Sequence, residues 1–61
     1  MSNFNQMELS SIREVVSCHI ATSNKLASYA NQCSDPHIKQ MFQQAAGEAQ
    51  KSAQKLTQML Q

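Results

Sequence analysis

Residues 9–33, LSSIREVVSCHIATSNKLASYANQC, decide the fold of this 61-residue chain. Apolar or small side chains recur through the stretch at alternating steps of three and four residues. Residues with this spacing stack on one side of an α-helix, so the pattern predicts a long helix with an unbroken heptad seam. The seam consists of Leu9, Ile12, Val16, His19, Ser23, Leu26, Ala30 and Cys33.

Apolar residues beside the seam widen the side that this helix would bury. Val15, Ile20 and Ala27 are interpreted as one flank, and a single partner helix would not cover both the seam and the flank. We therefore expect the helix to pack against at least two neighbours. His19 and Ser23 are polar and lie in the middle of the seam.

The start of the first helix is marked by two devices. Asn5 is placed to cap the free backbone amides while Glu8, three residues on, reaches back to the Asn5 amide, which makes a capping box. Phe4 before the cap and Leu9 at the fourth helical position form a hydrophobic staple. These signals predict a first helix over about residues 6–33, after a short tail over residues 1–4.

Ser34, Asp35 and Pro36 separate the first helix from a second one. A residue before proline disfavours the helical conformation, whereas proline itself suits the first position of a helix. Asp35 is thus both the linker and the N-cap. A connection of two to three residues makes the two helices antiparallel neighbours, with the second helix over about residues 36–60.

The second helix is expected to bury small residues in its middle and larger ones at its ends. Its outer faces carry Gln and Lys, and Gly47 indicates either a close approach or an exposed, tolerant position. The expected inner face is Ile38, Phe42, Ala45, Ala49, Ser52 or Ala53, Leu56, and Met59 or Leu60, with Met41 and Ala46 on its flank.

The expected fold is all-α, a single helical-hairpin domain over residues 1–61 that dimerises. An isolated helix pair of this size is marginal, because short chains bury only about 60% of their unfolded surface. Two hairpins docked face to face would make a four-helix bundle with twofold symmetry. The expected core and dimer interface comprises Leu9, Ile12, Val16, His19, Ile20, Leu26, Ile38, Phe42, Ala49, Leu56 and Leu60.

The composition argues against nucleic acid and membrane partners. Five Lys and Arg against four Asp and Glu give a net charge of +1, which provides no basic footprint for nucleic acid or a membrane surface. No apolar run approaches the roughly 20 residues of a membrane span, and no signal peptide is recognisable. With Met1 at its start, the chain is expected to be intracellular.

Cys18 and Cys33 are fifteen residues apart on the first predicted helix. That spacing separates them by about 22 Å along the axis, whereas a disulfide needs Cα atoms about 6 Å apart. They cannot pair within one chain. They are expected to be reduced, with an intermolecular disulfide through Cys18 as the alternative.

His19 is the one candidate for a metal ligand, since it lies midway along the core face, where helix bundles build metal sites. A carboxylate-bridged site would also need inward-facing Glu residues and a Glu-x-x-His pair. Neither occurs, because Lys51 follows three residues after Glu48 and Glu14 points away from the seam. The expected alternative is a neutral His19 bonded to Ser23 or to its symmetry mate.

No catalytic set can be drawn from these residues. Cys18 and His19 are adjacent, so they point to different faces of a helix and do not form a nucleophile–base pair. His37 is expected at the surface beside Asp35. Without a Gly-rich phosphate loop or zinc-ligand spacing, no enzyme activity and no cofactor are expected.

Several segments of the chain resemble the Coat F family of spore coat proteins. Tyr29-Ala30, followed by Asp35-Pro36 and a second helix, is the most specific part of the resemblance. The similar segments are residues 5–9 (NQMEL), 12–14 (IRE), 25–30 (KLASYA), 34–42 (SDPHIKQMF) and 55–56 (KL).

The resemblance implies a ferritin-like helical protein of the bacterial endospore coat. It would be a small structural or assembly protein, in the spore coat or the sporulating mother cell, with other coat proteins as partners. Longer members often carry a His on the second helix, but the matching position near Ala49 holds none. The chain looks like a half-length version of the fold, which agrees with dimerisation.

Two other functions fit the same residues. A helical adaptor would cover its apolar face with a different protein and would stay monomeric or partly unfolded alone. A degenerate ferritin-like metal binder would use His19.

Overall fold

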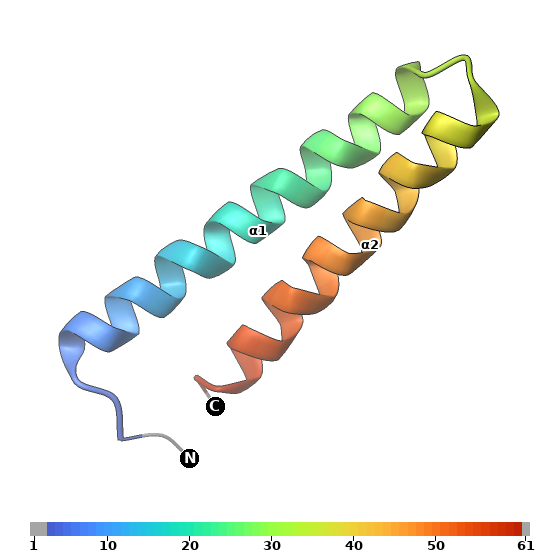
Figure 1. The fold of residues 1–61 in the computed structure, drawn as a ribbon. Helices are drawn as coiled ribbons and strands as arrows, with labels where there is room; N and C mark the ends of the chain where they lie inside the picture. Colours follow the sequence, from blue (N-terminus) through green and yellow to red (C-terminus); the bar gives the residue numbers. More distant parts are fainter. Residues whose placement is uncertain (1–2, 61) are drawn as a thin grey trace.

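The computed structural model describes residues 3–60 and consists of two long helices joined by a short turn (Figure 1). Helix α1 is Gln6–Gln32 and helix α2 is Pro36–Gln58. They run antiparallel and pack along their length, over Cα extents of 46 × 15 × 11 Å. The predicted all-α hairpin is confirmed. Met1, where the predicted tail begins, lies outside the described residues.

Both predicted helix starts are present with their capping bonds. The Glu8 amide donates to Asn5 Oδ1 at 2.8 Å, and the Asn5 amide donates to Glu8 Oε1 at 3.0 Å. Asp35 Oδ1 accepts from the amides of His37 at 2.8 Å and Ile38 at 3.2 Å. These bonds satisfy amide groups that have no partner inside their own helix.

The helix ends differ slightly from the prediction. Cys33 is not helical but is the C-cap of α1, with extended backbone and its amide bonded to the carbonyls of Tyr29 and Ala30. Met59 is the C-cap of α2. The second helix therefore ends two residues before the predicted Leu60.

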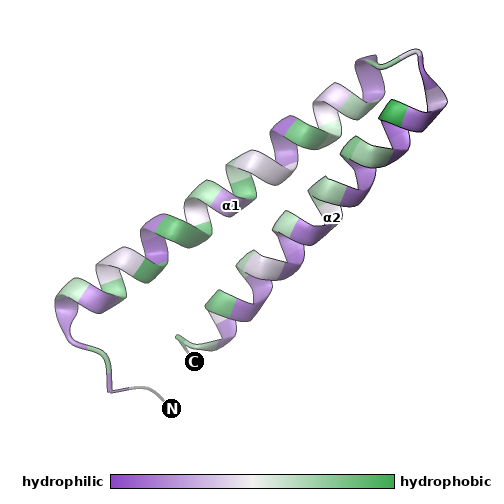
Figure 2. Ribbon diagram, in the orientation of Figure 1, coloured by the Kyte–Doolittle hydropathy of each residue, from purple (hydrophilic) through white to green (hydrophobic). Residues whose placement is uncertain are grey.

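The predicted seam is the side of α1 that faces α2. From residue 6 to residue 33 the buried and partly buried positions are the eight seam residues, and the residues between them are exposed. Apolar positions accordingly recur at intervals along both helices (Figure 2). The fully buried positions are small, Ser23 and Ala30 on α1 and Ala46 and Ala53 on α2. Among the described residues no large side chain is completely buried, so the core of one hairpin is thin.

The inner face of α2 is largely as predicted. The buried or partly buried positions include Phe42, Ala45, Ala49, Ser52, Ala53, Leu56 and Leu60. Two positions differ, because Ala46, expected on the flank, is 8% exposed and Ile38, expected inside, is 42% exposed. Ala46 is covered by a close contact at the middle of the hairpin, where Ser23 Oγ donates to its carbonyl at 3.0 Å.

Gly47 is exposed, with nothing within 4 Å of the position that a Cβ would occupy. Its φ is not positive, so neither a close approach nor a special conformation requires glycine there. Of the two predicted explanations, the exposed and tolerant position is correct.

Over residues 3–60, neither helix combines the length and apolar character that crossing a membrane would require.

Candidate interaction surface

The hairpin has two broad sides, each hollowed between its helices. On the first side, two hollows share Leu26 and Ala45 and so form one continuous groove. We call it the His19 side. Its groove is lined by Cys18, His19, Thr22, Leu26, Ile38, Met41, Phe42, Ala45, Glu48, Ala49 and Ser52.

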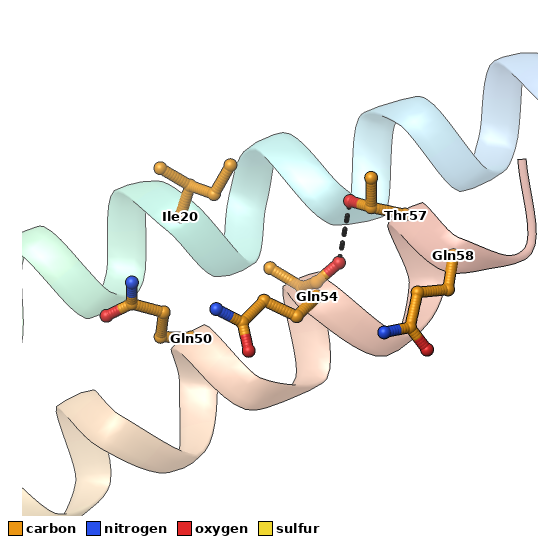
Figure 3. Close-up of a pocket in the computed structure, with 6 residues that line it drawn as sticks. Ile20, Gln50, Gln54, Thr57 and Gln58 are labelled. Carbon is orange, nitrogen blue, oxygen red and sulfur yellow. Dashed lines mark hydrogen bonds between the residues drawn. The ribbon is translucent and has the colours of Figure 1, made fainter. Parts of the chain in front are cut away.

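The opposite side, which we call the Ile20 side, is polar. Ile20 lies across from a row of glutamines on α2, Gln50, Gln54 and Gln58 (Figure 3). Thr57 closes this hollow and donates its hydroxyl to the Ala53 carbonyl at 2.8 Å. Ser17 and Asn24, three residues before and four after Ile20, lie on the same side of α1.

Large exposed apolar side chains gather on the His19 side. Ile38 and Met41 line its groove directly, with exposures of 42% and 57%. Val15 and Tyr29 lie one heptad before and one after Thr22, so they share its side of α1.

On α2, Met59 lies one heptad after Ser52 and extends the apolar surface to the end of that helix. Of the seven exposed large apolar residues in the described chain, the His19 side therefore carries five. Met7, near the start of α1, and Ile20 are the other two.

The predicted single flank of Val15, Ile20 and Ala27 is wrong. Five residues of helix rotate a side chain by about 140°, so Val15 and Ile20 lie on opposite sides of the seam. Ile20 accordingly lines the hollow opposite the one that His19 lines. Sequence reasoning also left Tyr29 out of the interface, although the line Val15, Thr22 and Tyr29 repeats every seven residues.

His19 and Ser23 satisfy their polar atoms separately and do not bond to each other as predicted. His19 Nδ1 lies 2.9 Å from the Val15 carbonyl oxygen, and Ser23 bonds across to Ala46. A carbonyl oxygen only accepts, so Nδ1 carries the proton of this bond. Over residues 3–60 no hydrogen bond reaches His19 Nε2, and Glu48 lines the same groove as His19.

An aromatic pair lies near the turn. The rings of Tyr29 and Phe42 are 5.8 Å apart between centroids and tilted by 59°, a favourable edge-directed arrangement. The pair joins α1 to α2 beside the hollow that Met41 lines. It therefore stabilises the contact between the two helices at the most apolar part of the His19 side.

The sequence analysis also singled out two cysteines and a second histidine. Cys18 is an exposed free thiol and Cys33 a partly buried one. His37 is exposed in the first turn of α2. Over residues 3–60, no three His, Cys, Asp or Glu residues are placed to hold a metal ion together.

Comparison with known families identifies the chain, whereas searches of curated proteins and of solved structures gave no match. The model of the Coat F domain matches residues 12–61. The matched range holds most of α1, the turn and the whole of α2. Because the match covers far more than half of the sequence, the chain belongs to the Coat F domain family and is associated with the spore coat.

Proposed function

We propose that this chain is a small structural or assembly protein of the bacterial endospore coat, and that it acts through helix packing and self-association. The observation that carries the proposal is the His19 side, where five large apolar side chains are exposed along the full hairpin. Family membership supplies the setting, the coat of the spore or the sporulating mother cell.

The thin core supports self-association. Full burial of a large apolar side chain such as Ile38 or Met41 stabilises the folded state by about 1.5–3 kcal/mol. A lone hairpin gains only part of this free energy, because these side chains remain exposed to solvent. A second copy docked on the His19 side would cover these side chains in both molecules at once. The product would be a homodimer in the form of a four-helix bundle, the ferritin-like arrangement that the family resemblance implies.

The proposed role is non-enzymatic and needs no cofactor, nucleic acid or membrane. Its partners are a second copy and, within the coat, other coat proteins. Over residues 3–60, no three His, Cys, Asp or Glu residues are placed to hold a metal ion together, which agrees with a packing role for the groove beside His19.

Sedimentation equilibrium tests the proposal. At micromolar concentration the protein should have twice the chain mass of 6.8 kDa. A compact, stable monomer would contradict self-association and favour a helical adaptor for another protein. A fluorescent fusion should collect at the surface of the developing spore, and an even distribution in the mother cell would contradict the coat role.

Metal analysis of the same preparation tests the remaining alternative. Protein purified without added metal should contain none in stoichiometric amount, and a chelator should leave its melting temperature unchanged. A chelator shift of several degrees would instead support metal binding at His19.

A further inference from the structure

We propose that the second copy docks on the His19 side with both turns at the same end, so that α1 lies over the partner's α2 and His19 meets the partner's Glu48. The inference rests on the self-association proposed above and specifies its surface and orientation.

The choice of side follows from the contrast between the two grooves. The Ile20 side is lined largely by glutamines, whose desolvation an apolar partner would not offset. On the His19 side, the part of the groove near the turn is lined by apolar residues alone, and five of the large exposed apolar side chains lie on this side. The hairpin as a whole extends 46 × 15 × 11 Å between Cα atoms, so one broad side has an outline of about 700 Å², on the scale of the roughly 800 Å² per partner of a specific interface.

Twofold docking of two hairpins face to face leaves two orientations. If the axis runs along the helices, both turns lie at the same end and each α1 covers the partner's α2. If the axis runs across the helices, the turns lie at opposite ends and each α1 covers the partner's α1. Neighbouring helices are antiparallel in both, so the helix dipoles do not choose between them.

The position of the largest apolar residues favours the same-end orientation. The bond between Ser23 and Ala46 sets the register of the hairpin, so Leu26 and Tyr29 lie near the level of Phe42 and Met41. Same-end docking therefore brings the most apolar parts of both His19 sides together near the two turns. Opposite-end docking instead places each of these parts over the far end of the partner hairpin.

Charge favours the same orientation. The bond between Ser23 and Ala46 sets these residues at one level of the hairpin, and the chains run in opposite directions from there. His19 and Glu48 are then about one helical turn apart in height or less. Same-end docking brings His19 of the partner beside Glu48, so that its Nε2 edge faces the carboxylate.

Opposite-end docking instead brings like charges together. Glu48 lies near the middle of α2, so full overlap of two such hairpins would place it beside the partner's Glu48. Two carboxylates facing each other at a partly desolvated interface oppose association.

A matched pair of lysine substitutions tests which side of the hairpin binds the second copy. Val15 and Ile20 are both β-branched, lie on the same helix, and are 42% and 48% exposed on opposite sides. Sedimentation should show V15K weakening the dimer at least about tenfold, because twofold symmetry applies each change twice, and I20K changing it less than about twofold. Dissociation by I20K alone, or equal effects of both, would overturn the choice of side. Should V15K lose its helical circular dichroism, M41K at a 57%-exposed position takes its place.

A spin-label distance tests the orientation. Ser34 is exposed in the turn, and S34C in a C18S/C33A background gives one label per chain. Same-end docking predicts a label separation under about 30 Å, since packed helices are about 10 Å apart. A separation above about 40 Å, approaching the 46 Å length of the hairpin, would overturn the orientation while leaving the dimer intact. Absence of a dimer in the unlabelled protein would overturn the proposed function itself.

Charge reversal tests the contact between His19 and Glu48. In the same-end dimer, E48K places lysine against the partner's His19 and should weaken association about threefold to thirtyfold, because the pair occurs twice in each dimer. In the opposite-end dimer the change replaces one repulsion with another and leaves affinity unchanged. E14K, at an exposed position on the far side of α1, is the matched control and should have no effect. Equal affinities for E48K and E14K would overturn the contact.

Discussion

Gly47 is a single residue at which the proposed docking side can be tested. It lies in the interior of α2, where glycine costs about 1 kcal/mol relative to alanine, and its surroundings are open. Nothing in the hairpin requires glycine there. The outward surface of α2 at this point is also free in a dimer that uses the His19 side.

We therefore predict that G47A raises the free energy of unfolding by about 0.5–1 kcal/mol, since alanine restricts the unfolded chain and fits the helix. Urea denaturation at one fixed protein concentration measures the change. Loss of stability or of self-association would show that another copy packs against Gly47, contrary to the proposed interface.

For Ser23 and His19, the sequence predicts the position of the side chain but not its hydrogen-bond partner. Both residues could be placed on the seam, because the heptad pattern determines the direction of a side chain. Their hydrogen-bond partners could not be predicted, since Val15 and Ala46 accept through backbone carbonyls that every residue carries. Only the rotamers and the distance between the helices select these bonds.

At the scale of the elements, the two helices were unequally predictable. The seam of α1 is correct at all eight positions because its steps of three and four residues continue without a break. In α2, Ala45 and Ala46 are adjacent and both are covered, although only Ala45 was expected inside. The close contact of Ser23 with Ala46 accounts for the difference, and no pattern within α2 contains that information.

Helix caps are the element-scale features most open to measurement. Removing the side-chain oxygen in N5A or D35A should lower stability by about 0.5–2 kcal/mol, because helix amides lose their acceptors. D35A should cost more, since Asp35 accepts from two amides and places a negative charge at the helix start. Thermal unfolding of both variants beside N31A, an exposed control near the end of α1, measures these differences. Equal stabilities for all three would contradict the capping roles.

At the scale of the whole molecule, the sequence predicts a hairpin that needs a partner, whereas the choice of the proposed docking side depends on the structure. The seam pattern identifies the residues between α1 and α2. It does not distinguish the two outer sides, because Val15 and Ile20 are similar residues at similar exposure. The glutamine row on α2 breaks this symmetry only once the two helices are placed in register.

Leu26 joins the intramolecular core to the proposed interface. It lies on the seam, is only partly buried in one hairpin, and lines both hollows of the His19 side. L26A should therefore lower stability by about 2–5 kcal/mol, the cost of a cavity beneath a covered leucine. Chemical denaturation of the dimer measures this value. A loss near zero would show that the site stays open to solvent.

The concentration dependence of the melting temperature tests the central claim most directly. If folding and self-association are linked, a tenfold rise in protein concentration stabilises the folded dimer by about 1.4 kcal/mol, which corresponds to several degrees. We predict this rise for the wild type and for I20K, and a smaller or absent rise for V15K. A melting temperature that stays constant across the concentration range would show that the hairpin is stable alone and would contradict the account.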